Sequence, residues 1–141
     1  MDKDIMKCFI GKVIRIGQGG PESRIGMLLD ASDDLIVLLT AEDGVVYYST
    51  KHIKSFTDNM KKQMKFNIKV PKDFKFKKAA NFQDLLDSLK LKWIKINNVG
   101  PEKLEGVLGD VNKDFVFLIH NQEIIRLSMS HIKSISYGVK I

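Results

Sequence analysis

The sequence predicts a mainly β protein in which one small unit occurs twice along the chain. When the sequence is aligned with itself, the tripeptide Gly20-Pro21-Glu22 matches Gly100-Pro101-Glu102. With a deletion of one residue between the motifs, His52-Ile53-Lys54-Ser55 matches His131-Ile132-Lys133-Ser134. Between these motifs, short β-branched and aromatic runs alternate with Gly, Pro and Asp, as strands alternate with turns.

The first copy is expected to begin with a short helix and to continue with four strands. Residues 2–9 place Ile5, Cys8 and Phe9 on one face of an amphipathic helix. The strands are expected where apolar runs lie between turn residues, at 13–16, 25–29, 35–39 and 45–48.

The second copy repeats this order of elements. Asn81 is a suitable N-cap for a helix in which Phe82, Leu85, Leu86 and Leu89 recur at helical spacing. Strands are expected at 93–96, 104–108, 115–119 and 123–127, and a short piece at 132–135 ends the copy.

A short helix followed by four or five bent strands has the outline of an Sm-like or SH3-like small barrel, by analogy of fold alone. Gly26 and Gly106 lie where the second strand of each copy must bend sharply. We therefore expect two tandem barrels. The predicted organisation is a first repeat at 1–56, a lysine-rich connecting segment at 57–80 that is partly strand, and a second repeat at 81–141.

The Gly-Pro-Glu motif predicts a tight turn between the first and second strands of each copy. Proline restricts one backbone angle and the preceding glycine allows conformations that other residues avoid. The motif lacks the Lys and the Ser or Thr of a phosphate-binding loop, so nucleotide binding is not expected. Glu22 and Glu102 are expected to cap the turn or to pair with bases such as Arg24 and Lys103. The motif residues expected to shape the repeats are Gly19, Gly20, Pro21, Glu22, Gly26, His52, Gly100, Pro101, Glu102, Gly106 and His131.

The polar residues form no pattern that is typical of catalysis or metal binding. His52 and His131 occupy matching positions, but neither has a second ligand at the spacing of a zinc site. The acidic cluster of the first copy, Asp33, Asp34, Glu42 and Asp43, falls in turns and keeps only Asp114 as a counterpart in the second copy. We therefore expect no catalytic residue, no cofactor and no metal site.

The positive charge is concentrated in the connecting segment. The chain has a net charge of +6, and the segment 57–80 accounts for all of it. Phenylalanines alternate with the lysines, a pattern that fits an exposed strand with a solvated lysine face, a surface for an acidic protein partner, or a surface that binds nucleic acid. The candidate interaction surface consists of Lys61, Lys62, Lys65, Lys69, Lys72, Lys75, Lys77 and Lys78.

The N-terminal residues mix acids with bases and predict no secretory signal. The longest apolar run, 35–39, is too short for a membrane-spanning helix. Cys8 is the single cysteine, which suits a reducing compartment, and we expect it to be a buried thiol.

Taken together, the motifs resemble the spore coat protein B family of spore-forming bacteria. The resemblance rests on Gly-Gly-Pro-Glu-Ser at 19–23, Gly-Val-Val-Tyr-Tyr at 44–48, the two His-Ile-Lys-Ser pieces and the closing segments 121–126 and 131–136. The sequence departs from the family in having a strongly basic segment between the copies and no long Ser/Lys-rich C-terminal tail. It fits either a shorter paralogue or a piece of a longer chain.

The resemblance implies a non-enzymatic, structural component of the spore coat that acts through protein–protein contacts. It also implies synthesis in the mother-cell cytoplasm, deposition in the coat and other coat proteins as partners. Because exposed strand edges are pairing surfaces, homo-oligomers are a further expectation. The alternative is an Sm-like nucleic-acid-binding protein that uses the basic segment between the copies.

Overall fold

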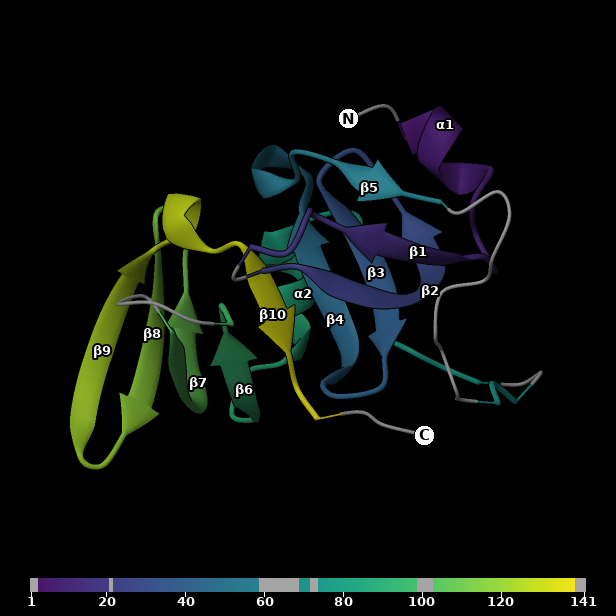
Figure 1. The fold of residues 1–141 in the computed structure, drawn as a ribbon. Helices are drawn as coiled ribbons and strands as arrows, with labels where there is room; N and C mark the ends of the chain where they lie inside the picture. The colour runs from purple at the N-terminus through teal and green to yellow at the C-terminus, as the bar shows by residue number, and fades with distance from the viewer. Residues whose placement is uncertain (1–2, 21, 59–68, 72–73, 99–102, 139–141) are drawn as a thin grey trace.

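The computed structural model describes residues 3–20, 22–58, 69–71, 74–98 and 103–138 (Figure 1). It is mainly β, with ten antiparallel strands in one open sheet of order β5-β1-β2-β3-β4-β10-β6-β7-β8-β9. The elements in chain order are α1 (Lys3–Lys7), β1 (Val13–Ile16), β2 (Arg24–Ala31), β3 (Leu35–Thr40), β4 (Gly44–Ser49), the 3-10 helix η1 (Thr50–His52), β5 (Phe56–Thr57), α2 (Phe82–Ser88), β6 (Trp93–Ile96), β7 (Leu104–Val111), β8 (Phe115–His120), β9 (Glu123–Ser128), the 3-10 helix η2 (Met129–His131) and β10 (Ser134–Ser136).

Residues 3–58 form what we call the first half and residues 81–138 the second half, and both have the same order of elements. In both halves the register of the second and third strands shifts at a similar place, between Leu28 and Asp30 and between Leu108 and Val111. The expected helix after Asn81 is confirmed, since the Asn81 side chain accepts a hydrogen bond from the Asp84 amide at 2.8 Å. The last strand starts at Ser134 rather than Ile132, because Ile132 is the C-cap residue that follows η2.

The two expected barrels are not confirmed, because the sheet stays open and the halves share it. β10 lies between β4 of the first half and β6 of its own half. Its counterpart β5 pairs with β1, and the sheet order places β5 at one end of the sheet. The outer edge of β4 therefore joins the two halves instead of closing the first one (Figure 1).

Two apolar clusters stabilise this arrangement. One lies within the first half and includes Met6, Ile14, Leu28, Ile36 and Tyr48. The other spans both halves, because it combines the opposite face of β3 and β4 with α2 and the strands of the second half. Burial of each such side chain contributes about 1.5–3 kcal/mol, so the shared cluster links the stability of the halves.

Gly26 and Gly106 lie where two strands approach closely. A β-carbon placed on Gly106 would be 2.6 Å from the carbonyl oxygen of Ile119, and one on Gly26 would collide with the carbonyl oxygen of Leu39. Only glycine leaves room for these neighbouring carbonyl groups.

Among the described residues, no helix has the length and apolar character needed to cross a membrane.

Candidate functional site

The candidate site is the junction between the halves, where β10 hydrogen-bonds to β4. Ser134 lies opposite Tyr48, Ile135 opposite Tyr47 and Ser136 opposite Val46. The Ser49 amide extends the pairing by donating to the carbonyl oxygen of Lys133 at 2.9 Å. The junction is thus a main-chain strand pairing between parts of the sequence that are far apart.

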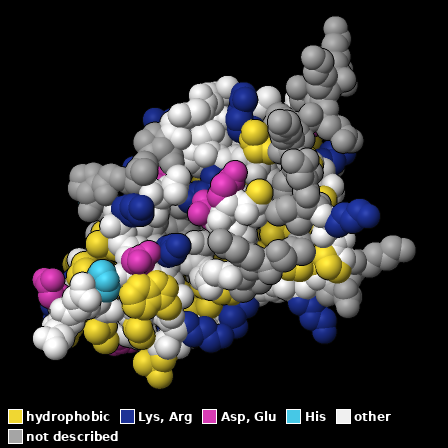
Figure 2. All heavy atoms as spheres, turned by 60° about the horizontal axis from the view of Figure 1, so that its bottom comes forward, with side chains coloured by type: hydrophobic (Ala, Val, Ile, Leu, Met, Phe, Trp, Pro, Cys, Tyr) yellow, Lys and Arg dark blue, Asp and Glu magenta, His cyan; other side chains and the backbone are white. Residues whose placement is uncertain are grey.

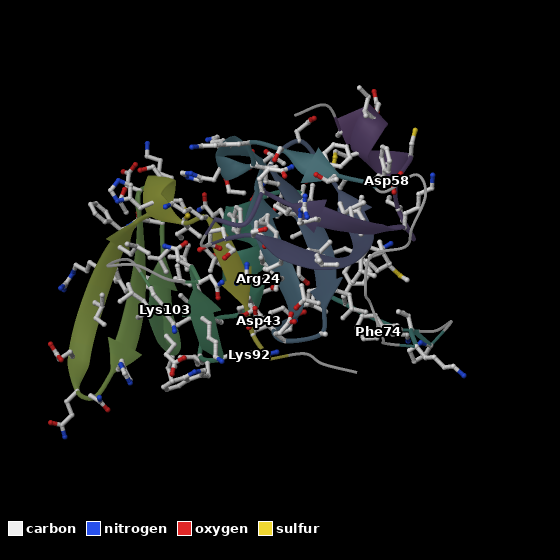
Figure 3. All side chains as sticks on the ribbon, in the orientation of Figure 1. Arg24, Asp43, Asp58, Phe74, Lys92 and Lys103 are labelled. Atoms are coloured by element: carbon white, nitrogen blue, oxygen red, sulfur yellow. The ribbon has the colours of Figure 1, made fainter. Side chains whose placement is uncertain are left out.

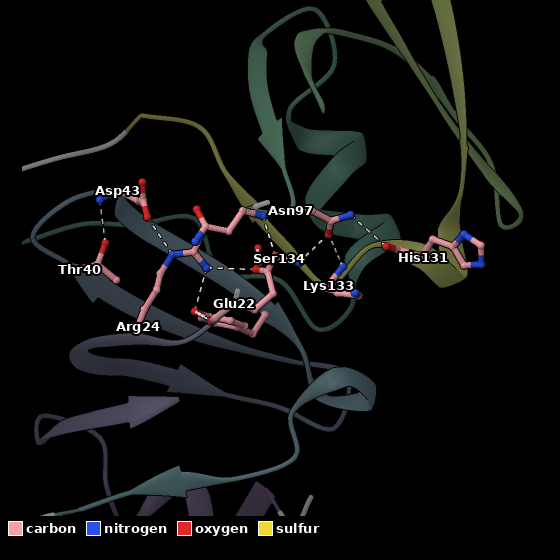
Figure 4. Close-up of polar contacts among 10 residues, drawn as sticks. Glu22, Arg24, Thr40, Asp43, Asn97, His131, Lys133 and Ser134 are labelled. Atoms are coloured by element: carbon pink, nitrogen blue, oxygen red, sulfur yellow. Dashed lines mark hydrogen bonds and ion pairs between the residues drawn. The ribbon is translucent and has the colours of Figure 1, made fainter. Parts of the chain in front are cut away.

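Glu22, from the Gly-Pro-Glu motif of the first half, bridges the junction with both carboxylate oxygens (Figure 4). The Ser134 hydroxyl donates to Oε1 at 2.5 Å, and the Asn98 amide donates to Oε2 at 2.6 Å. Both donors belong to the second half. The loop carrying Glu22 is shaped by a hydrogen bond from the Ser23 amide to the Gly20 carbonyl at 2.9 Å.

Arg24 places a buried positive charge beside this carboxylate. Its Nη1 lies 3.3 Å from Glu22 Oε1, and its Nε lies 2.8 Å from Asp43 Oδ2 (Figures 3 and 4). Nη1 also donates to the Tyr48 hydroxyl at 2.8 Å, and that hydroxyl donates to the Glu22 carbonyl at 2.7 Å. The pairing of Glu22 with Arg24 is one of the two roles that the sequence offered for this glutamate.

Burial and pairing act in opposite directions on the ionisable groups of this network. Burial by itself lowers the pKa of Arg24, but the adjacent Tyr48 and Asp43 outweigh it, so that the pKa is raised. Burial raises the pKa of Tyr48 to about 12, although Arg24 opposes this effect. Arg24 is therefore a cation and Tyr48 a neutral hydroxyl near neutral pH, as their hydrogen bonds require.

Asn97 positions the start of β10. Its backbone has a positive φ of 60°, and its side-chain oxygen accepts from the Lys133 amide at 2.7 Å. Its side-chain nitrogen donates to the His131 carbonyl at 3.2 Å, and its own amide donates to the Ser134 carbonyl at 2.9 Å. Asparagine tolerates the left-handed conformation better than most residues, and its short amide side chain can hydrogen-bond to nearby backbone groups.

A second polar contact ties β4 to the connecting segment. The Tyr47 hydroxyl donates to the Lys77 carbonyl at 2.7 Å and lies 3.1 Å from the Tyr137 hydroxyl. Burial, with the Tyr137 hydrogen bond, raises the pKa of Tyr47. Tyr47 and Tyr48 thus point to opposite faces of β4 and are both buried and hydrogen-bonded.

The two matching histidines have different surroundings. His52 Nε2 lies 2.9 Å from the Ser130 carbonyl and adds a contact between the halves. The His131 carbonyl oxygen accepts a hydrogen bond from the Asn97 side chain, and His131 itself is exposed. Among the described residues, no three His, Cys, Asp or Glu side chains gather as a metal site would need.

The connecting segment is described in part. Lys69, Lys75 and Lys78 are exposed and Lys77 is half-buried, whereas Lys61, Lys62, Lys65 and Lys72 lie outside the described residues. No strand forms at 74–80, yet Phe74 and Phe76 pack against the cluster shared by the halves. Figure 3 places Phe74 on the side of the first half that is remote from the second half.

Three further motif residues of the second half, Gly100, Pro101 and Glu102, lie outside the described residues, as does Pro21. Gly19 has a positive φ of 99°, which glycine adopts readily. The expectation of a buried thiol is wrong: Cys8 is exposed because its neighbour Met6 takes the inward position on α1.

Sequence reasoning missed that Glu22 connects the two halves, as well as the roles of Asn97, Asp43 and Tyr48. The Gly-Pro-Glu motif marked the loop, but nothing in the spacing indicated that its carboxylate meets Ser134. The pair Asn97-Asn98 before a turn was the available signal, because asparagine is enriched at positive φ.

No protein-family model matches the chain. Among curated proteins, it is 38% identical to spore coat protein B of Bacillus subtilis (strain 168) in an alignment of 144 residues that covers 99% of the chain. The chain spans 37% of the length of that protein. Because the alignment runs through both halves and covers 99% of the chain, the chain belongs to the spore coat protein B family.

Proposed function

We propose that this chain is a structural, non-enzymatic component of the bacterial spore coat that acts through protein–protein contacts. The observation that carries the proposal is the 38% identity to a spore coat protein over 99% of the chain. The chain spans 37% of the length of that relative, so the proposal covers only the part of the relative that the two halves match.

The architecture supports an assembly role. The open sheet ends in β5 on one side and β9 on the other, and a strand edge presents backbone donors and acceptors to another strand. The charged groups of the junction are engaged with one another and with the backbone, so their contacts serve to hold the halves together.

The finer features of the proposal follow from the sequence. The lysine-rich segment 57–80, between the repeats at 1–56 and 81–141, meets acidic surfaces of partner proteins. Its partners are other coat proteins and further copies of the chain. Synthesis takes place in the mother cell, and deposition in the coat follows. No observation favours the nucleic-acid alternative.

A fluorescent fusion followed through sporulation tests this function. The fusion would be expressed from a mother-cell promoter in Bacillus subtilis that lacks its own spore coat protein B, with the free fluorescent protein as the control. We expect a ring of fluorescence around the forespore for the fusion and a diffuse signal for the control. A fusion that stays diffuse in the mother cell, or that gathers on the mother-cell nucleoid, would refute the coat assignment.

A further inference from the structure

Matching strands of the two halves differ sharply in burial. The alignment of the repeats pairs Leu35 with Phe115, Leu39 with Ile119 and Val45 with Ile124. The first-half residues are 0–1% exposed, whereas Phe115, Ile119 and Ile124 are 45%, 44% and 57% exposed. All six residues of β3 and all six of β4 are buried, but β8 and β9 keep exposed positions.

The second half helps to bury this face of the first half, together with connecting-segment residues such as Phe74 and Phe76 that pack against the same cluster. The inner residues of the face belong to the same apolar cluster as Phe82, Leu85, Leu86 and Leu89 around α2. Figure 1 shows α2 behind β4 and β10, and β10 pairs with the edge of β4. Among the described residues, no strand pairs with the outer edge of β9. Figure 2 shows hydrophobic side chains gathered at this end of the molecule, around a histidine.

The first half carries a second copy of the surface that covers β4. The alignment pairs Leu85 of α2 with Ile5 of α1, and Leu85 is fully buried whereas Ile5 is 56% exposed. It also pairs β10 with β5. β10 hydrogen-bonds to β6 and β4, whereas β5 hydrogen-bonds to β1 and stands at the end of the sheet.

We propose that copies of this chain join head to tail through these two surfaces. The β9 edge and the outer face of β8 and β9 of one copy receive β5 and α1 of the next, as β4 receives β10 within one chain. Transfer of the internal register, in which Ser134, Ile135 and Ser136 face Tyr48, Tyr47 and Val46, defines the contact. It places Ser55 opposite Leu127, Phe56 opposite Arg126 and Thr57 opposite Ile125.

The occupant is a second copy because the chain contains both sides of the contact and already forms it once. Ile5 on the donor side and Ile124 on the acceptor side are both exposed, and the residues that match them are both buried in the internal contact. An interface between two different surfaces of the same chain is heterologous, so it forms a ring if the rotation closes and a filament if it does not.

This contact between copies is weaker than the internal one. Arg24 and Tyr48, which supply buried hydrogen bonds at the internal junction, are matched by Leu104 and Leu127 in the second half. The intermolecular contact therefore depends on strand pairing and apolar burial, and on no covalent connection. We expect reversible, concentration-dependent association.

The inference rests on the proposed function, since it names one partner for an assembly protein, and sedimentation of the purified chain tests it. The wild type should shift from monomer to larger species as its concentration rises. Ile124→Lys on the acceptor side and Ile5→Asp on the donor side should each weaken association by about tenfold or more, because each puts a charge into the buried contact. Leu91→Lys, at an exposed apolar residue outside both surfaces, should associate as the wild type does.

A mixture of the two variants gives the decisive result. Ile124→Lys keeps an intact donor surface and Ile5→Asp keeps an intact acceptor surface, so the mixture should form a dimer at a concentration at which each variant alone is monomeric. Circular dichroism would establish that both variants are folded. A wild type that stays monomeric at all concentrations, variants that associate like the wild type, or a mixture without dimers would overturn the inference.

The coat assignment and the self-association can fail separately, because different experiments test them. A monomeric protein whose fusion still forms the forespore ring would remove the self-association and leave the proposed function intact. A self-associating protein whose fusion stays diffuse would do the opposite.

Discussion

Glu22 shows how a residue of a repeated motif acquires a role through its position in the tertiary structure. Its two carboxylate oxygens accept from Ser134 and Asn98, and the nearby Arg24 guanidinium balances its charge. The Glu22 side chain is 20% exposed and the Arg24 side chain is 7% exposed, so the medium around them screens charge weakly. Removal of one of these side chains therefore leaves the buried charges or hydrogen-bonding groups of the others unpaired.

We predict that Glu22→Gln lowers the free energy of unfolding by about 1.5–3 kcal/mol. The amide has one oxygen where the carboxylate has two, so its NH2 group must face either the Asn98 amide or Arg24 Nη1, both of which can only donate. The substitution also removes the negative charge beside Arg24. Urea denaturation followed by circular dichroism measures the change.

Glu42→Gln is the matched control, because Glu42 is exposed and should tolerate the substitution within about 0.5 kcal/mol. A Glu22→Gln protein as stable as this control would show that the Glu22 bridge contributes nothing to the junction.

At the scale of elements, the glycines of the repeats fall into two kinds. Gly26 and Gly106 face the carbonyl oxygens of the neighbouring strand with no space for a side chain. Gly20, in the Gly-Pro-Glu motif, has open space where a β-carbon would lie, with no atom within 4 Å, and its φ is not positive. Gly26 and Gly106 therefore recur because two strands approach closely there, whereas steric space does not explain the glycine at position 20.

We predict that Gly26→Ala destabilises the protein by about 1–3 kcal/mol, because the added methyl group forces β2 away from β3. Gly20→Ala, the control in the same half, should leave the midpoint of thermal unfolding nearly unchanged. Equal effects of the two substitutions would contradict the close strand approach at Gly26.

At the scale of the whole molecule, strand pairing, polar side-chain contacts and apolar burial all link the two halves. The strand pairing of β4 with β10, the Glu22 bridge and the shared apolar cluster all join residues of the first half to residues of the second. Separation of the halves would expose the apolar face of β3 and β4 and leave the Glu22 bridge broken. Unfolding of one half should therefore destabilise the other.

We predict a single cooperative unfolding transition for both halves. Trp93, the single tryptophan, reports on the second half by its fluorescence, and a dye on the exposed Cys8 reports on the first half. Urea titrations with the two probes should give coincident curves. Two separated transitions would mean that the repeats at 1–56 and 81–141 are independently stable domains.

Much of the local structure could be predicted from the sequence, because strands, turns and the α2 helix depend on neighbouring residues. The ranges 13–16 and 93–96 match β1 and β6 residue for residue, and the other predicted strands differ from the observed ones by a few terminal residues. The short strand β5 was not predicted. The alternation of β-branched residues with Gly, Pro and Asp was sufficient for this. The family resemblance likewise depended on motifs that are local in the sequence.

The sequence by itself determined the strands, the capped helix and the doubled order of elements, since each follows from short-range spacing. Only the tertiary structure decided that β10 pairs with β4, that Glu22 meets Ser134 and that the sheet remains open. The physical reason is that the edge of β4 has the same hydrogen-bonding groups whether it pairs with its own half or with the other. The choice between them depends on apolar burial and polar contacts among residues far apart in the chain.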